Sequence, residues 1–197
     1  MARAILIVVI ACFCGTSLGP MALPAQAKNK AELVDIKLGR GKGNLEVSFR
    51  IQDCFTPKME EAIRSGVATT FRILLELEKP GLQSHIPFPF LKSRLLKIAL
   101  EHTIKYDLLN NEYNVYIPEH PDRILTTPDL EEAKLWMSSV RELPVIPLWR
   151  LKKNETYQLR MKAELSKFNL PLFFRYIFFF VSLWDFDTDW HKLVFSL

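Results

Sequence analysis

Apolar and polar residues alternate with a period of two in five separate segments of this chain. In each segment every second side chain is apolar or aromatic, and those between are mostly charged or polar. The five segments are residues 45–51, 67–78, 96–107, 157–165 and 184–190. Because successive side chains of a β-strand point to opposite faces, this pattern predicts strands with one buried and one solvated face. Such strands are typical of antiparallel sheets, since parallel strands are buried on both faces.

Turn-forming residues lie between these segments. A glycine-rich stretch at residues 39–44 separates a weaker strand, residues 32–38, from the first strong one, and it predicts a hairpin. Asn110-Asn111 predicts a second turn ahead of a strand at residues 113–117, because asparagine tolerates positive φ. A third turn is expected at residues 152–154, ahead of the fourth alternating segment.

Two short helices are expected among the strands. Thr56-Pro57 predicts a helix that runs to about Arg64 and ends near Gly66. Threonine caps the first turn, and proline is tolerated at the first helical position, where its missing N–H costs nothing. Thr127-Pro128 predicts a second helix by the same reasoning, which ends near Ser139.

Together these elements predict a mainly β fold, of the β-rich α+β class. We expect an antiparallel β-sandwich or open barrel of about seven to nine strands with two short helices, because two packed faces would bury the apolar sides of the strands. We expect residues 28–197 to form a single domain, because no internal repeat or long linker divides them.

The first 27 residues have the layout of a secretory signal peptide. Arg3 precedes an unbroken apolar run at residues 4–14, and Ala25-Gln26-Ala27 matches a small-x-small cleavage pattern. We therefore expect export to the periplasm and a mature chain that begins at Lys28. Two alternatives stay open: an uncleaved N-terminal membrane anchor, since no charge interrupts residues 4–27, and lipidation of a cysteine within this segment.

The charge of the chain argues against a nucleic-acid partner, and its cysteine content argues against an internal disulfide. The chain carries a formal charge of +4 at pH 7, and the signal segment holds one arginine and no acid, which leaves +3. Basic residues are spread along the chain, unlike those of a nucleic-acid-binding surface. Cys54 alone follows the signal segment, so the mature domain has no internal disulfide. We expect Cys54 to be a small buried apolar residue, and an intermolecular disulfide is the alternative.

Three features resemble ligand sites, and each has a plainer explanation. The loop at residues 39–44 lacks the spacing of a phosphate-binding loop. The triad Asp185, Asp187 and Asp189 resembles the start of a calcium loop, but alternation with tryptophans favours the solvated face of a strand. His102 lies between apolar positions, which favours a hydrogen-bonded core histidine over a metal ligand.

The sequence therefore names no catalytic, cofactor-binding or metal-binding residue. The histidines lack metal-type spacing, and no serine lies in a nucleophile motif. We expect a protein that is not an enzyme, with no cofactor and no nucleic-acid partner; a hydrolase is the enzymatic alternative.

The least ordinary segment is residues 168–183, where phenylalanines crowd around a single charge, Arg175. The segment has no amphipathic face, so it either lies in the core or contacts a membrane, a lipid or a protein. Its central arginine makes it a poor transmembrane helix. The candidate interaction surface consists of Phe173, Phe174, Phe178, Phe179 and Phe180.

Several short motifs occur in an order that is typical of one family. They are DCFTP at residues 53–57, EAIRSGV at 61–67, IKYDL at 104–108, EYNV at 112–115, LPL at 170–172 and WDFDTDW at 184–190. Together they resemble a family of exported proteobacterial proteins, the domain of unknown function 4390, over essentially the whole mature chain. The family has no assigned activity, so the resemblance implies no catalytic residues. Its members are often encoded beside a membrane sensor kinase of the nitrogen-regulation type, which implies a link to envelope signalling.

Two functional hypotheses follow. The first is a non-enzymatic binding or accessory module of the cell envelope, which acts on a protein or lipid and makes peripheral membrane contact through residues 168–183. The second is a carrier that holds a small apolar ligand or lipid inside a β-barrel, since small barrels can enclose one ligand.

Overall fold

The computed structural model describes residues 31–80, 94–119, 122–166 and 186–197. These residues form nine strands, two α-helices and one 3-10 helix. The elements in chain order are β1 (Glu32–Gly41), β2 (Asn44–Gln52), α1 (Pro57–Arg64), β3 (Thr69–Glu78), β4 (Arg94–Asp107), β5 (Glu112–Tyr116), β6 (Leu125–Thr127), α2 (Leu130–Ser138), β7 (Ser139–Pro147), η2 (Leu148–Arg150), β8 (Thr156–Leu165) and β9 (His191–Ser196). The predicted β-rich α+β class is confirmed.

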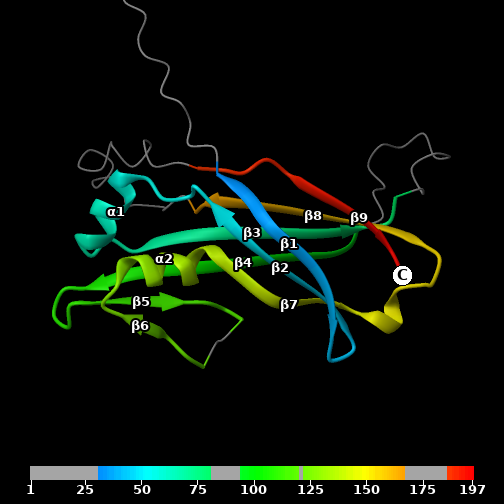
Figure 1. The fold of residues 1–197 in the computed structure, drawn as a ribbon, viewed down its shortest axis with the longest axis horizontal. Helices are drawn as coiled ribbons and strands as arrows, with labels where there is room; N and C mark the ends of the chain where they lie inside the picture. The colour runs from blue at the N-terminus through cyan, green and yellow to red at the C-terminus, as the bar shows by residue number, and fades with distance from the viewer. Residues whose placement is uncertain (1–30, 81–93, 120–121, 167–185) are drawn as a thin grey trace, which may run out of the picture.

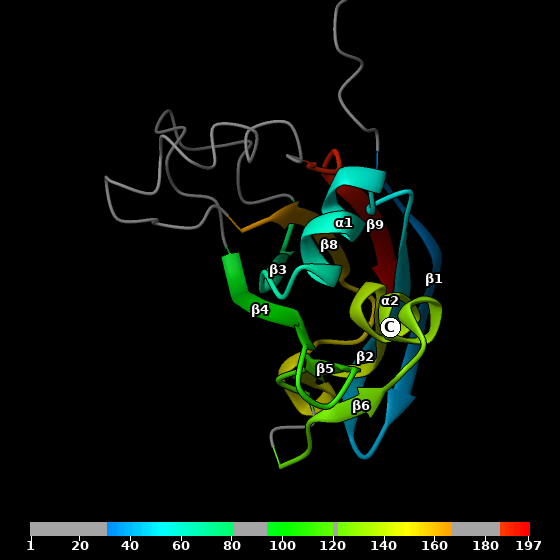
Figure 2. The same cartoon turned by 90° about the vertical axis from the view of Figure 1, so that its left-hand side faces the viewer.

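The strands form two antiparallel sheets. The smaller has the order β1-β2-β7, and the larger has the order β6-β5-β4-β3-β8-β9. The larger sheet curls into a half-barrel, which is visible end-on in Figure 2. Figure 1 shows β1 and β2 crossing in front of the long strands β3, β4 and β8, while α1 and α2 both lie toward its left-hand end.

The core fills the space between the sheets. Alternate side chains of β2, β3 and β8 are buried, as the period-two pattern predicts. Phe71 lies fully buried in β3, with ring-centre distances of 5.0 Å to Phe55 and 4.8 Å to Phe186. Aromatic pairs at such distances add stability beyond the burial of their area. Methionines from both helices, Met59 and Met137, are also fully buried.

The first hairpin and the first helix form where the sequence predicts them. Lys42 and Gly43, with φ of 46° and 81°, make the two-residue turn between β1 and β2. The Thr56 side chain accepts a hydrogen bond of 3.1 Å from the backbone N–H of Met59, and α1 begins at Pro57. Gly66 follows the helix with φ of 83°, a value that glycine adopts without strain.

The start of the second helix differs from the prediction. Asp129, rather than Thr127, caps α2, because its carboxylate accepts a 2.9 Å hydrogen bond from the N–H of Glu131. Thr127 instead ends β6, and its hydroxyl donates to Glu132 at 2.6 Å. Thr127 and Asp129, which flank Pro128, can both cap a helix, and Asp129 is the residue that caps α2.

The last predicted strand is misplaced. Residues 184–185 lie outside the described residues, and Asp187 forms an isolated bridge to Glu164 of β8. The backbone ladder is interrupted at Thr188. The N–H of Ala163 donates a 3.0 Å hydrogen bond to the Thr188 hydroxyl instead of to a backbone carbonyl. The regular edge strand is β9, which pairs with the first half of β8. Phe186 is nonetheless fully buried, as the alternation predicts.

The prediction also lacks β6 and β7. β6 has three residues, and β7 contains Pro144 and Pro147, which break the alternating pattern. Proline is tolerated here because β7 is an edge strand, which needs hydrogen bonds on one side only. A bulge at Glu142, with φ of 48°, shifts the register further.

Candidate functional site

The main pocket lies at a seam between the two sheets. β6 ends the larger sheet and β7 ends the smaller one, and no backbone ladder joins these two edges in the described residues. α2 connects them and lies beside β5 and β6. The pocket at this seam has a volume of about 450 Å³. It is lined by Ile117, Glu119, Asp122, Arg123, Leu125, Trp136, Ser139 and Arg141.

The pocket combines an apolar wall with cationic groups. Ile117, Leu125 and Trp136 supply the apolar wall. Arg123 comes from the connection between β5 and β6, and Arg141 comes from β7. Both arginines are exposed, and neither forms an ion pair with another described residue.

A buried polar pair supports the floor of this pocket. His102 of β4 has no exposed surface, and Nε2 lies 3.0 Å from Oε1 of Glu119. On its other side, Nδ1 lies 2.9 Å from the carbonyl oxygen of Met137 in α2. Since a carbonyl oxygen only accepts, Nδ1 carries a proton and donates it. His102 thereby ties β4, α2 and the pocket-lining Glu119 together, which confirms it as a hydrogen-bonded core histidine.

The pair fixes the charge that a ligand meets in the pocket. Nε2 and a carboxylate oxygen at 3.0 Å need one shared proton between them, and His102 and Glu119 together are then neutral wherever that proton resides. Among the described residues of the lining, Asp122, Arg123 and Arg141 remain as the charged groups. The described part of the lining therefore has a net positive charge beside an apolar wall.

A second hollow of about 310 Å³ lies between the end of β2 and α2, and it serves the fold. Partial burial opposes the charged form of Lys134, but its hydrogen bonds to Glu60 at 2.6 Å and Glu131 at 2.9 Å outweigh it, and they hold the pKa of Lys134 above its ordinary value. Cys54 also lines this hollow, with 2 % of its surface exposed. Burial raises the pKa of its thiol to about 12, although hydrogen bonding and Lys134 act in the opposite direction. The prediction of a buried apolar cysteine is confirmed.

The outer face of the larger sheet carries a network of ion pairs centred on Glu76. Glu76 is nearly buried and lies 3.5 Å from Arg94, 3.9 Å from Lys97 and 3.6 Å from Arg160. The guanidinium of Arg160 lies over the ring of Trp190 at 4.5 Å. These contacts resemble the cross-strand pairs that stabilise sheets.

Asp187 of the predicted aspartate triad joins this outer face. Its carboxylate lies 3.5 Å from Nζ of Lys162, and Asp185 lies outside the described residues. Among the residues that the structure describes, no cluster of three or more His, Cys, Asp or Glu side chains is arranged to hold a metal ion.

The candidate interaction surface at Phe173, Phe174, Phe178, Phe179 and Phe180 lies outside the described residues, as does the signal segment. Within the described part of the chain, no helix has the length and apolar character needed to cross a membrane. Sequence reasoning missed the seam pocket, because its lining comes from four separate elements. The only available signal was the polar-apolar mixture of residues 117–125, which carries no recognisable spacing.

Comparison with known proteins gives a family. Neither a curated protein nor a solved structure matches the chain. The profile of one family, described as a domain of unknown function, DUF4390, matches residues 28–194. That match covers the predicted mature chain almost completely and agrees with the resemblance of its short motifs. The chain belongs to the DUF4390 family.

Proposed function

We propose that this protein is an exported, non-enzymatic binding module of the cell envelope that holds an acidic group of a partner protein in the seam pocket. One observation carries the proposal: Arg123 and Arg141 line the same pocket and have no ion partner among the described residues. Arginine binds carboxylates through paired N–H donors, and such charge-assisted hydrogen bonds are among the strongest in proteins.

The apolar wall narrows the class of partner. Trp136 lies beside the cationic groups, so a carboxylate that is attached to an apolar body would meet both surfaces. The volume of about 450 Å³ lies within the ordinary range of ligand pockets. An acidic side chain flanked by apolar residues, or the C-terminus of a partner, has this chemistry.

The exported and the non-enzymatic parts of the proposal have separate support. Export rests on the signal-like layout of the first 27 residues. The non-enzymatic part is supported by His102, a buried titratable group beside the pocket, because both of its ring nitrogens are engaged in structural hydrogen bonds. A general base needs a nitrogen that can reach a substrate proton.

The alternative, a carrier with an apolar ligand inside the half-barrel, has less support. Inward-facing side chains such as Phe71, Leu159 and Met161 are fully buried against one another and against the smaller sheet. Interiors that are packed in this way have few voids larger than a water molecule. The seam pocket, by contrast, opens at the surface beside exposed arginines.

A pull-down from native membranes tests the proposal. The variant is Arg123→Gln/Arg141→Gln, and the matched control is Arg72→Gln/Lys105→Gln, which removes two exposed cations on other elements. We expect the pocket variant to lose the captured protein while the control retains it, with both melting temperatures unchanged. Equal capture by both variants would refute the pocket as the binding site.

A further inference from the structure

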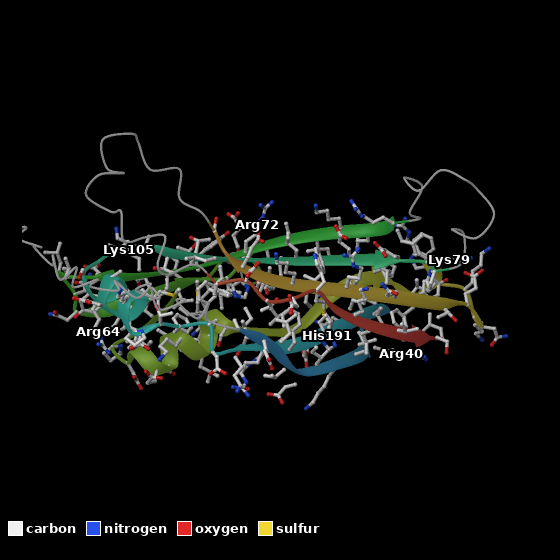
Figure 3. All side chains as sticks on the ribbon, turned by 90° about the horizontal axis from the view of Figure 1, so that it is seen from above. Arg40, Arg64, Arg72, Lys79, Lys105 and His191 are labelled. Atoms are coloured by element: carbon white, nitrogen blue, oxygen red, sulfur yellow. The ribbon has the colours of Figure 1, made fainter. Side chains whose placement is uncertain are left out.

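The end of the molecule that carries the turn between β1 and β2 has an excess of cations. Arg40 and Lys42 lie in that hairpin, and Arg150, Lys152 and Lys153 lie in or just after η2. All five side chains are exposed, and none forms a salt bridge with a described residue. Figure 3 shows Arg40 and Lys79 toward this end, with Arg64 and Lys105 toward the opposite end. We call these five residues, together with Trp149, the basic end.

Two connections hold the basic end together. The N–H of Leu148, at the start of η2, donates a 2.9 Å hydrogen bond to the carbonyl of Gly43 in the hairpin turn. The N–H of Lys152 donates a 2.8 Å hydrogen bond to the hydroxyl of Tyr157 in β8. The cations therefore belong to fixed neighbouring loops, although they are far apart in the sequence.

The acids at this end neutralise only part of the charge. Glu155 is bonded to Lys79 at 2.8 Å and to the Tyr157 hydroxyl at 2.9 Å, and these bonds hold its pKa below the ordinary value. Glu46 lies close to Gly41 in the hairpin. The five exposed cations still outnumber these groups.

A large aromatic side chain stands among the cations. Trp149 has 82 % of its surface exposed, although exposure of so much apolar area is unfavourable in water. An indole ring is amphipathic and is favoured at the boundary between lipid headgroups and water. Cations beside it would meet the negative charge of anionic lipids.

We propose that the basic end docks on the surface of a membrane that contains anionic lipids, with Trp149 at the headgroup level. The proposal is independent of the seam pocket, which lies on α2, β6 and β7. It also differs from the predicted phenylalanine surface, which the described residues do not include. A membrane is favoured over an acidic protein because the tryptophan is exposed on a short 3-10 helix rather than lining a pocket.

Co-sedimentation with lipid vesicles tests this surface. The probes are vesicles of phosphatidylcholine alone and equimolar vesicles of phosphatidylcholine and phosphatidylglycerol. We expect binding to the anionic vesicles only, and weaker binding as salt is raised. Lys152→Gln/Lys153→Gln should weaken it about thirtyfold, since each lysine near an anionic surface contributes about fivefold. Trp149→Ser should also weaken it, because the indole ring is favoured at the headgroup level.

Matched controls lie away from the basic end, with Lys105 toward the opposite end and Arg72 between the two ends (Figure 3). Leu109→Ser removes an apolar side chain that is 91 % exposed, and Arg72→Gln/Lys105→Gln removes two exposed cations. Neither control should change vesicle binding more than about twofold. Equal binding of the basic-end variants and the wild type would overturn the proposal, and so would equal binding to both vesicle types. Binding to a soluble polyanion such as heparin, without binding to the anionic vesicles, would also overturn it.

Discussion

The two ends of the half-barrel differ in how many of their polar side chains have partners within the molecule. At the helical end, which consists of α1, α2 and the His102–Glu119 pair, buried and half-buried polar side chains find partners inside the molecule, whereas Arg123 and Arg141 of the adjoining seam pocket have no ion partner among the described residues. Lys134 joins α1 to α2 through Glu60, and His102 bonds on both sides of its ring. At the basic end, five cations and Trp149 face solvent without ion pairs among the described residues. The comparison indicates that internally satisfied polar groups hold the fold, while unsatisfied ones are available to partners.

The first prediction uses the reactivity of Cys54, at the helical end. Its thiol pKa of about 12, against an ordinary 9.0, leaves about a thousandfold less thiolate near neutral pH, and the thiolate is the reactive form. We expect labelling by iodoacetamide to be slower than for the unfolded chain by at least this factor. Because burial raises this pKa, the stability that it contributes is complete below pH 9.0 and is lost as pH rises toward 12. Rapid labelling of the native protein would show that the helical end opens readily.

The second prediction concerns the core. Phe71→Ala should lower the free energy of unfolding by about 3–5 kcal/mol, because it removes a fully buried ring that contacts Phe55 and Phe186. Chemical denaturation measures this change. Leu109→Ala is the matched control, and we expect it to change stability very little because Leu109 is exposed. A small effect of Phe71→Ala would contradict the packed interior.

The loss of stability expected for a buried ring also gives a test of the phenylalanine segment at residues 168–183. If Phe178 and Phe179 lie in the core, the variant Phe178→Ser/Phe179→Ser should be largely unfolded, with a loss at least as large as that of Phe71→Ala. If they form an interaction surface, the variant should no longer associate with membranes or partners, and its melting temperature should be unchanged. We expect the unfolded outcome, which a thermal melt and a membrane fractionation distinguish from the other.

The third prediction concerns the energetic coupling between His102 and Glu119 at the floor of the pocket. Glu119→Leu should cost about 3 kcal/mol, because His102 is fully buried and loses the partner of Nε2. His102→Leu/Glu119→Leu should be less destabilised than the sum of the two single variants, since no buried nitrogen is then left unpaired. Additive losses in this double-mutant cycle would show that the two residues are not coupled.

The parts of the fold that the sequence predicts are those that local rules determine. The strands at residues 45–51, 69–78 and 157–165 alternate because each has one buried face. The helix at residues 57–64 has its cap, its first-position proline and its terminal glycine in the sequence itself. The alternating pattern also predicts that His102 is buried, because this residue lies on the apolar face of its strand.

Other parts depend on distant contacts and escape such rules. β7 is a strand only because β2 pairs with it, and its two prolines oppose that prediction. Glu119 is identified as the partner of His102 only when the loop after β5 folds back onto β4. The seam pocket exists because a curled sheet leaves the edges of β6 and β7 apart, which is a property of the tertiary structure.

The fourth prediction is the smallest and compares the two ends directly. Thr56→Ala should lower stability by about 1 kcal/mol, since it removes the cap of α1 at the helical end. Lys152→Gln/Lys153→Gln, at the basic end, should change stability by less than about 0.5 kcal/mol, because both side chains are exposed. A larger effect of the lysine changes would indicate that the basic end is structural.

Native mass spectrometry of the protein, gently extracted from the envelope of its own cells, tests the central claim most directly. That claim is an exported binding module with a filled interior and surface sites for partners. We predict the mass of residues 28–197, alone or with a bound protein, and without a retained small apolar molecule. An intact Met1 would contradict cleavage of the signal segment, and a small apolar molecule that stays with the protein would instead favour the carrier.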